Sequence, residues 1–119
     1  MKENVVAEKS DAFALRMVKL YKHLSLEKKE FILSKQVLRS GTSVGANIEE
    51  AIAASSKADF INKLNIAAKE TRETIYWLRL LKDSDFITKS SFGSVHQDAV
   101  ELKKILSSIL LTTKSTHNS

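Results

Sequence analysis

Hydrophobic side chains recur at every third or fourth residue along four segments of the chain, with short polar stretches between them. This spacing places them on one face of an α-helix and predicts four amphipathic helices at about 10–24, 27–54, 56–82 and 88–111. Because the connections are short, successive helices must run antiparallel, so the pattern predicts an all-α fold, an antiparallel up-down four-helix bundle. The inward-facing positions predicted for the four helices are Phe13, Met17, Leu20 and Leu24; Val37, Val44, Ile48 and Ile52; Phe60, Leu64, Ala68, Thr71, Ile75 and Leu78; and Phe92, Val95, Ala99, Leu102, Leu106 and Ile109.

Polar residues at the predicted helix ends support these boundaries. Ser10 is placed to cap the first helix, and Ser56, with an aspartate three residues later, resembles a capping box that opens the third. The triplet Asp83-Ser84-Asp85 interrupts the apolar pattern, and Thr88 or Ser90 caps the last helix.

Composition agrees with a single helical domain. The 119 residues include no proline and only three glycines, so the turn residues typical of β folds are missing. The predicted organisation is an N-terminal arm at 1–9, the bundle at 10–112 and a flexible polar tail at 113–119.

Several classes of protein are excluded by what the chain lacks. With no cysteine it can form neither disulfides nor cysteine-based zinc sites, and no apolar run approaches the length of a membrane span. No membrane partner is therefore expected, and the predicted location is the cytoplasm. The formal net charge of +5 permits a nucleic-acid partner without requiring one.

The segment LRSGTSVGANIEEA, at residues 38–51, contains poor helix formers although its flanks predict helix. Gly41 and Gly45 each cost about 1 kcal/mol of helix propensity relative to alanine, so close packing against another backbone is the expected compensation. The alternative is a weak, slightly kinked helix whose polar side faces solvent. Beside the glycines a polar line continues along one side of the helix: Gln36, Ser40, Ser43, Asn47 and Glu50.

Three stretches of the chain resemble the 23S rRNA intervening-sequence proteins, often called four-helix bundle proteins. The stretches are SKQVLRSGTSVGANIEEA at 34–51, SKADF at 56–60 and KETRET at 69–74 running into Tyr76-Trp77-Leu78. The resemblance implies a four-helix bundle that assembles into a ring, commonly a homopentamer. Some members are encoded inside inserts of large-subunit rRNA genes, and relatives are accessory proteins of the reverse transcriptases of diversity-generating retroelements. Nucleic-acid binding is the role considered for the family.

One side of the third helix carries apolar residues too far from its core stripe to be buried by the same bundle. Trp77 lies there, and exposed apolar surface containing tryptophan is typical of an interface. We therefore predict a homo-oligomer; the alternative is that Trp77 covers the edge of its own bundle. The predicted interface residues are Arg39, Ser40, Gly45, Asn47, Glu50, Ile66, Glu70, Glu73, Trp77 and Leu80. Glu70 and Glu73 are expected to pair with Arg39 or the polar line of a neighbouring chain.

The remaining side of the third helix combines cations with an aromatic ring, as proteins that bind unpaired nucleic acid do. Arg16, Lys19 and His23 form a second basic line on the first helix. The residues predicted to bind nucleic acid are Arg16, Lys19, Lys69, Arg72, Tyr76 and Arg79. The alternative is an ordinary solvated charged face.

Two functions follow. One is an oligomeric protein that binds RNA or DNA; the other is an interaction scaffold or accessory subunit that docks a nucleic-acid enzyme such as a reverse transcriptase.

Catalysis is not predicted. Di-iron bundles need inward Glu-x-x-His pairs, and neither His23 nor His96 has a glutamate three residues before it. No phosphate-binding glycine loop, Ser-His-Asp set or thiol is present either. We therefore expect no catalytic residues, no metal site and no cofactor.

Overall fold

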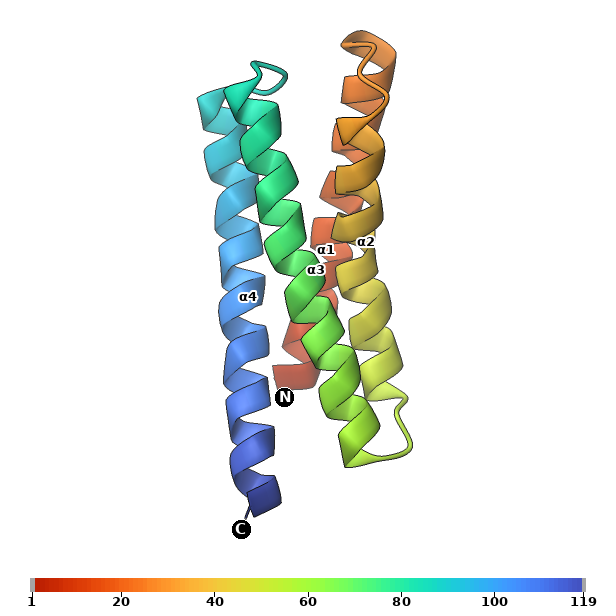
Figure 1. Ribbon diagram of the computed structural model, residues 1–119, viewed down its shortest axis with the longest axis vertical. Helices are drawn as coiled ribbons and strands as arrows, with labels where there is room; N and C mark the ends of the chain where they lie inside the picture. Colours follow the sequence, from red (N-terminus) through yellow and green to blue (C-terminus); the bar gives the residue numbers. More distant parts are fainter. Residues whose placement is uncertain (1, 119) are drawn as a thin grey trace.

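Four helices run alternately up and down the long axis of a molecule that measures 51 × 22 × 20 Å (Figure 1). The computed structural model describes the backbone of residues 2–118 and the side chains of residues 5–115. The helices are α1 (Lys2–Lys22), α2 (Leu33–Ile52), α3 (Lys57–Asp83) and α4 (Lys89–Asn118), and a π-helical turn, η1 (His23–Glu27), extends α1. The predicted all-α up-down bundle is confirmed.

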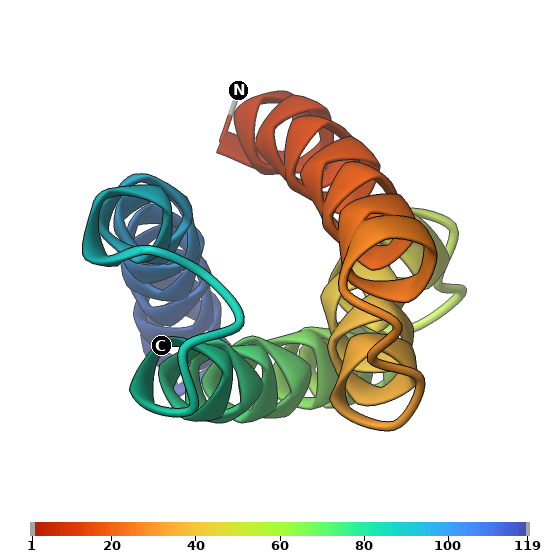
Figure 2. The same cartoon turned by 90° about the horizontal axis from the view of Figure 1, so that it is seen from above.

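Each helix packs against its neighbours in sequence, and α1 also packs against α4 (Figure 2). The α1–α4 side is the most open one. It is bridged by two ion pairs, Lys9 Nζ to Glu101 Oε1 at 3.1 Å and Arg16 Nη1 to Asp98 Oδ2 at 2.6 Å. Because α1 and α3 occupy diagonal corners, their outer faces point in different directions.

The predicted start of the first helix is wrong. The helix begins at Lys2 and includes most of the expected arm, because Val6 is buried in the core and extends the apolar face by two turns. Ser10 therefore lies inside α1, fully buried, where its hydroxyl donates a hydrogen bond to the Ala7 carbonyl at 3.0 Å. The last helix likewise continues past Leu111 to Asn118. Met1 and Ser119, the ends of the predicted arm and tail, lie outside the described residues.

The caps of α3 and α4 are confirmed. Ser56 Oγ accepts a hydrogen bond from the backbone N–H of Asp59 at 3.1 Å, and Thr88, rather than Ser90, accepts from the backbone N–H of Ser91 at 3.0 Å. These side chains satisfy backbone donors that the first turn of a helix leaves without partners.

The second helix starts at Leu33, not near residue 27, because the chain turns at Lys29, where φ is 55°. The Glu30 carboxylate then accepts hydrogen bonds from the backbone N–H groups of Ile32, Leu33 and Ser34 at 3.2, 3.0 and 2.7 Å. Burial raises the pKa of Glu30, but these hydrogen bonds outweigh it and hold the pKa below its usual value. Glu30 thus caps α2 from just outside it.

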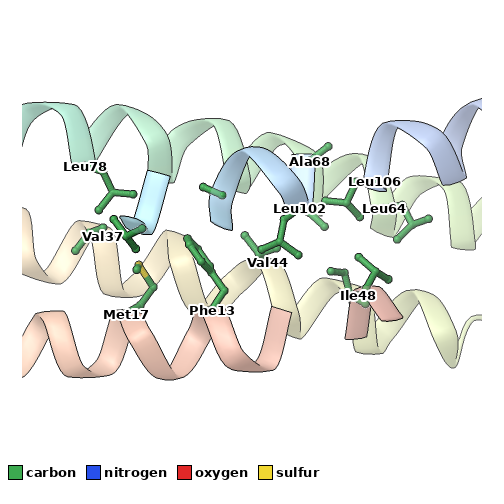
Figure 3. Close-up of a cluster of buried hydrophobic side chains, with 14 of the residues drawn as sticks. Phe13, Met17, Val37, Val44, Ile48, Leu64, Ala68, Leu78, Leu102 and Leu106 are labelled. Atoms are coloured by element: carbon green, nitrogen blue, oxygen red, sulfur yellow. The ribbon is translucent and has the colours of Figure 1, made fainter. Parts of the chain in front are cut away.

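The core follows the predicted apolar stripes. Phe13, Met17, Val44, Leu64 and Leu102 interdigitate between the four helices (Figure 3). Ile52, predicted to be inward, is the last residue of α2 and is 48% exposed.

Candidate nucleic-acid interface

The two glycines of α2 pack against α1 inside the same chain. A Cβ on Gly41 would lie 2.8 Å from Met17 Sδ and closer still to Met17 Cγ, and one on Gly45 would lie 3.4 Å from Ser10 Oγ and 3.6 Å from the Ser10 carbonyl oxygen. The predicted close approach of another backbone is thus present at Gly45. Its partner is α1, so Gly45 is buried within its own chain rather than presented to a neighbouring subunit.

Ser40 also lies inside the bundle. It is fully buried, and its hydroxyl oxygen is hydrogen-bonded to Thr74 Oγ1 of α3 at 2.8 Å. Like Gly45, Ser40 is therefore covered by its own chain. Asn47 bonds to its own helix, with Nδ2 donating to the Ser43 carbonyl at 2.9 Å, and Glu50 is exposed.

Arg39 pairs with the two glutamates of α3 in the same chain. Its Nη1 lies 3.2 Å from Glu70 Oε2, its Nη2 contacts Glu73 Oε2, and the Trp77 indole N–H donates to that same Glu73 oxygen at 3.0 Å. Arg39, Glu70 and Glu73 were predicted to pair across a subunit contact, but they form these ion pairs within a single chain. Trp77 is half-buried and packs against the edge of the core, as the alternative interpretation held.

The apolar surface that remains exposed lies mainly elsewhere. Ile66 and Leu80 are half-buried, whereas Leu26, Phe31 and Ile32 are 68%, 51% and 75% exposed around the connection between η1 and α2. The sequence pattern placed Phe31 and Ile32 inside a helix that begins near residue 27, and this exposed apolar group was therefore missed. The sequence feature that could have indicated their exposure is their position beside the charged residues 27–30.

The basic line of α3 lies on its outer face. Lys69, Arg72 and Arg79 are exposed, and none of them forms an ion pair with any described residue. Tyr76, between the arginines, is 45% exposed, with the Arg79 guanidinium carbon 5.8 Å from the centre of its ring. The Trp77 ring packs edge-on against it, with centroids 5.0 Å apart. The helix thus holds three available cations and a supported aromatic ring on one surface.

The basic line of α1 is not continuous with that of α3, because the two helices lie diagonally across the bundle. Arg16 turns toward α4, where it contacts Asp98 and donates to Ser94 Oγ at 3.1 Å. Lys19 is exposed, and His23 Nδ1 lies 2.6 Å from Glu27 Oε2. All three residues line a cleft at one end of the α1–α4 side. Whether any of these residues contacts nucleic acid stays a prediction.

Neither a metal cluster nor a membrane-spanning helix is found in the described part of the chain. No three histidine, aspartate or glutamate side chains there gather around one possible ion. No described helix is both long and apolar enough to cross a bilayer. His96 instead stacks on Phe92, with ring centroids 4.9 Å apart.

Known proteins resemble this chain along most of its length. A crystal structure of a protein of unknown function from the S23 ribosomal protein family of Bacteroides thetaiotaomicron is 58% identical in sequence, with a TM-score of 0.92. The similarity covers 92% of this chain and 98% of that one. No curated protein matches the sequence. Residues 2–108 match the family described as 23S rRNA-intervening sequence protein. The chain therefore belongs to the 23S rRNA-intervening sequence protein family.

Proposed function

We propose that this protein binds RNA through the outer face of α3, chiefly by contacts to phosphates. The observation that carries the proposal is the line of unpaired cations Lys69, Arg72 and Arg79 around the exposed Tyr76. Ten residues of helix rise by about 15 Å. That length covers about four nucleotide steps at the 3.4 Å spacing of a stacked strand.

Tyr76 adds a contact that discriminates between kinds of nucleic acid. Unpaired bases stack on exposed aromatic rings, whereas bases within a duplex are already stacked. Arg79 and Trp77 both contact the Tyr76 ring, so it loses little conformational freedom when a base stacks on it. The proposed preference is for looped or single-stranded RNA.

Assembly would strengthen this binding, and we propose a homo-oligomer of pentameric size. Five copies of the +5 chain carry a formal charge of about +25, which attracts polyanions at low salt. Since Ser40 and Gly45 are buried, the proposed contact surface consists of the half-buried Trp77 and Leu80 and of the exposed end of α2 near Glu50.

A protein-docking function is the second candidate. It is favoured by the exposed apolar residues Leu26, Phe31 and Ile32, which lie beside Lys28 and Lys29 and suit an acidic partner with an apolar surface. The proposed partner is a nucleic-acid enzyme, such as the reverse transcriptase of a diversity-generating retroelement.

A salt titration tests the RNA proposal. Binding of the assembled protein to looped RNA, single-stranded DNA and duplex DNA is measured at several salt concentrations. Each neutralised phosphate contributes a log-log slope of about −0.7 on a single strand, so Arg72→Ala should flatten the dependence and weaken binding to all three. Tyr76→Ala should weaken binding to looped RNA by about 1 to 3 kcal/mol and leave duplex binding unchanged.

Lys104→Ala is the matched control, because Lys104 is an exposed cation of α4 and its substitution removes the same charge from a different face of the bundle. It should change affinity much less than Arg72→Ala. Equal losses would mean that net charge alone attracts RNA. No binding of the correctly assembled protein at low salt would exclude the proposal and leave the docking function.

A further inference from the structure

A cleft of about 740 Å³ lies between α1 and α4 and is also lined by residues of the connections 28–32 and 84–88. These two connections lie at the same end of the bundle (Figure 1). The ion pairs of Lys9 and Arg16 join α1 to α4, and none of the described side chains forms a further ion pair between the two helices. The C-terminal end of α1 and the N-terminal end of α4 lie apart (Figure 2). The volume lies within the range of about 300 to 1,000 Å³ typical of small-molecule sites.

Three cations, one histidine and one carboxylate line the cleft. Arg16 pairs with Asp98, and His23 Nδ1 lies 2.6 Å from Glu27 Oε2. Lys19 and Lys28 are exposed and form no ion pair within the side chains that the structure describes. The cleft therefore presents two ammonium groups to an incoming anion.

The other lining side chains are apolar or carry hydroxyls. Leu20, Phe86 and Ile87 are only half-buried although they pack against the core, so the bundle leaves part of their surface uncovered at the cleft. Thr88 and Ser91 place hydroxyls beside them, with the two oxygens 3.0 Å apart. The site thus has an apolar wall, hydrogen-bonding groups and a cationic side.

The remaining lining group, Asp85, narrows the class of ligand. It is exposed, and it has no ion-pair partner among the described side chains, so it can accept hydrogen bonds from hydroxyl or amino groups of a ligand. A fatty acid would carry one charge for two lysines and no donor for Asp85. A nucleotide supplies a phosphate of charge near −2, ribose hydroxyls and a flat apolar base.

We propose that this cleft binds a single nucleotide unit, with its phosphate at Lys19 and Lys28, its ribose or base edge at Asp85 and its base against Phe86 and Leu20. Lysines neutralise the phosphate as point charges, and the base removes apolar surface of the cleft from water. The site goes beyond the RNA-binding face of α3, because it can take a free nucleotide even if α3 binds no RNA.

Two sources share this chemistry, a free nucleoside monophosphate and the unpaired terminal nucleotide of an RNA strand that carries a 5′-monophosphate. Calorimetric titration of the full-length protein with AMP and UMP tests the first. Competition between AMP and a short 5′-phosphorylated single-stranded RNA tests the second. Displacement of the RNA by AMP identifies an RNA nucleotide as an occupant, and AMP binding without displacement identifies the free nucleotide; either outcome supports the site.

The variants are chosen to keep the bundle folded. Lys19→Ala with Lys28→Ala removes the unpaired cations and should weaken AMP binding at least tenfold, because it removes both charged partners of the phosphate. Ser91→Phe should block the cleft from an exposed position of α4. Lys22→Ala is the control: it removes an exposed cation of α1 that does not line the cleft, and AMP affinity should not change.

Four results would overturn the proposal. They are no AMP or UMP binding at millimolar concentration in low salt, inorganic phosphate binding as tightly as AMP, decanoate binding more tightly than AMP, and affinity unchanged in Ser91→Phe. Arg72→Ala separates this site from the face of α3, since it should weaken RNA binding there without changing the affinity for AMP.

Discussion

Alanine substitution at the three glycines of the chain should give three different changes in stability, although each gains the same helix propensity. All three lie inside helices, so Gly→Ala should stabilise each by about 1 kcal/mol if nothing opposes it. The opposing energy depends on what the new methyl group meets. Gly93 of α4 is exposed, and beyond the adjacent backbone of its own helix no atom lies within 4 Å of the methyl position, so Gly93→Ala should realise the full gain.

Alanine substitution at the two buried glycines should stabilise the protein less than Gly93→Ala does, and Gly41→Ala should give the lowest stability. At Gly45 the methyl would contact Ser10 Oγ at 3.4 Å, an ordinary van der Waals distance, so part of the gain should remain. At Gly41 it would overlap Met17 Cγ and lie 2.8 Å from Sδ. Met17 is fully buried, so its side chain must shift within the core to admit the methyl group, and overpacking of a core typically costs about 1 to 3 kcal/mol. Gly41→Ala should therefore be destabilising by up to about 2 kcal/mol.

Urea unfolding followed by circular dichroism measures the series. All variants must be compared at one protein concentration, because the self-association that we propose would make apparent stability depend on concentration. The expected order of stability changes is Gly93→Ala above Gly45→Ala above Gly41→Ala. If Gly41→Ala stabilised the protein as much as Gly93→Ala, the close packing of α2 on Met17 would not restrict this position, and the explanation of the glycines would be refuted.

Three further predictions concern the core, the cap of α2 and assembly. Leu102→Ala should cost about 2 to 5 kcal/mol in the same unfolding assay, since Leu102 is 1% exposed at the centre of the bundle; a loss under 1 kcal/mol would contradict that placement. Glu30→Gln should cost about 1 kcal/mol at pH 7. Because the pKa of Glu30 is lowered in the folded state, its carboxylate stabilises the protein above the unfolded pKa of about 4.3. This stabilisation is lost as pH falls through the folded pKa, so the stabilities of Glu30→Gln and wild type should converge in acid. A constant difference in stability down to pH 2 would be inconsistent with a role for this charge. Trp77→Ala with Leu80→Ser should shift the proposed oligomer toward monomer in sedimentation equilibrium with helicity retained, and a wild-type protein that is monomeric at micromolar concentration would exclude that interface.

The sequence determined which face of each helix is buried and where two helices begin. Leu64 and Leu102 could be assigned to the core from spacing alone, since helical geometry fixes which side chains share a face. Ser56 and Thr88 could be identified as caps because capping is satisfied within one turn of chain. The basic face of α3 was predictable for the same reason, since its members are three or four residues apart.

The tertiary structure alone decided which faces meet. The glycines of α2 indicated close packing, but only the assembled bundle identified α1 as the partner, because an amphipathic pattern does not specify the helix that covers it. Arg39 and the glutamates of α3 were correctly associated, but their pairing within one chain depends on the register of α2 against α3. The cleft likewise joins residues 16–28 to residues 85–95, which are separated by more than fifty residues of sequence. Local periodicity is set by bonds along one helix, whereas these contacts are set by the packing of helices that are distant in the chain.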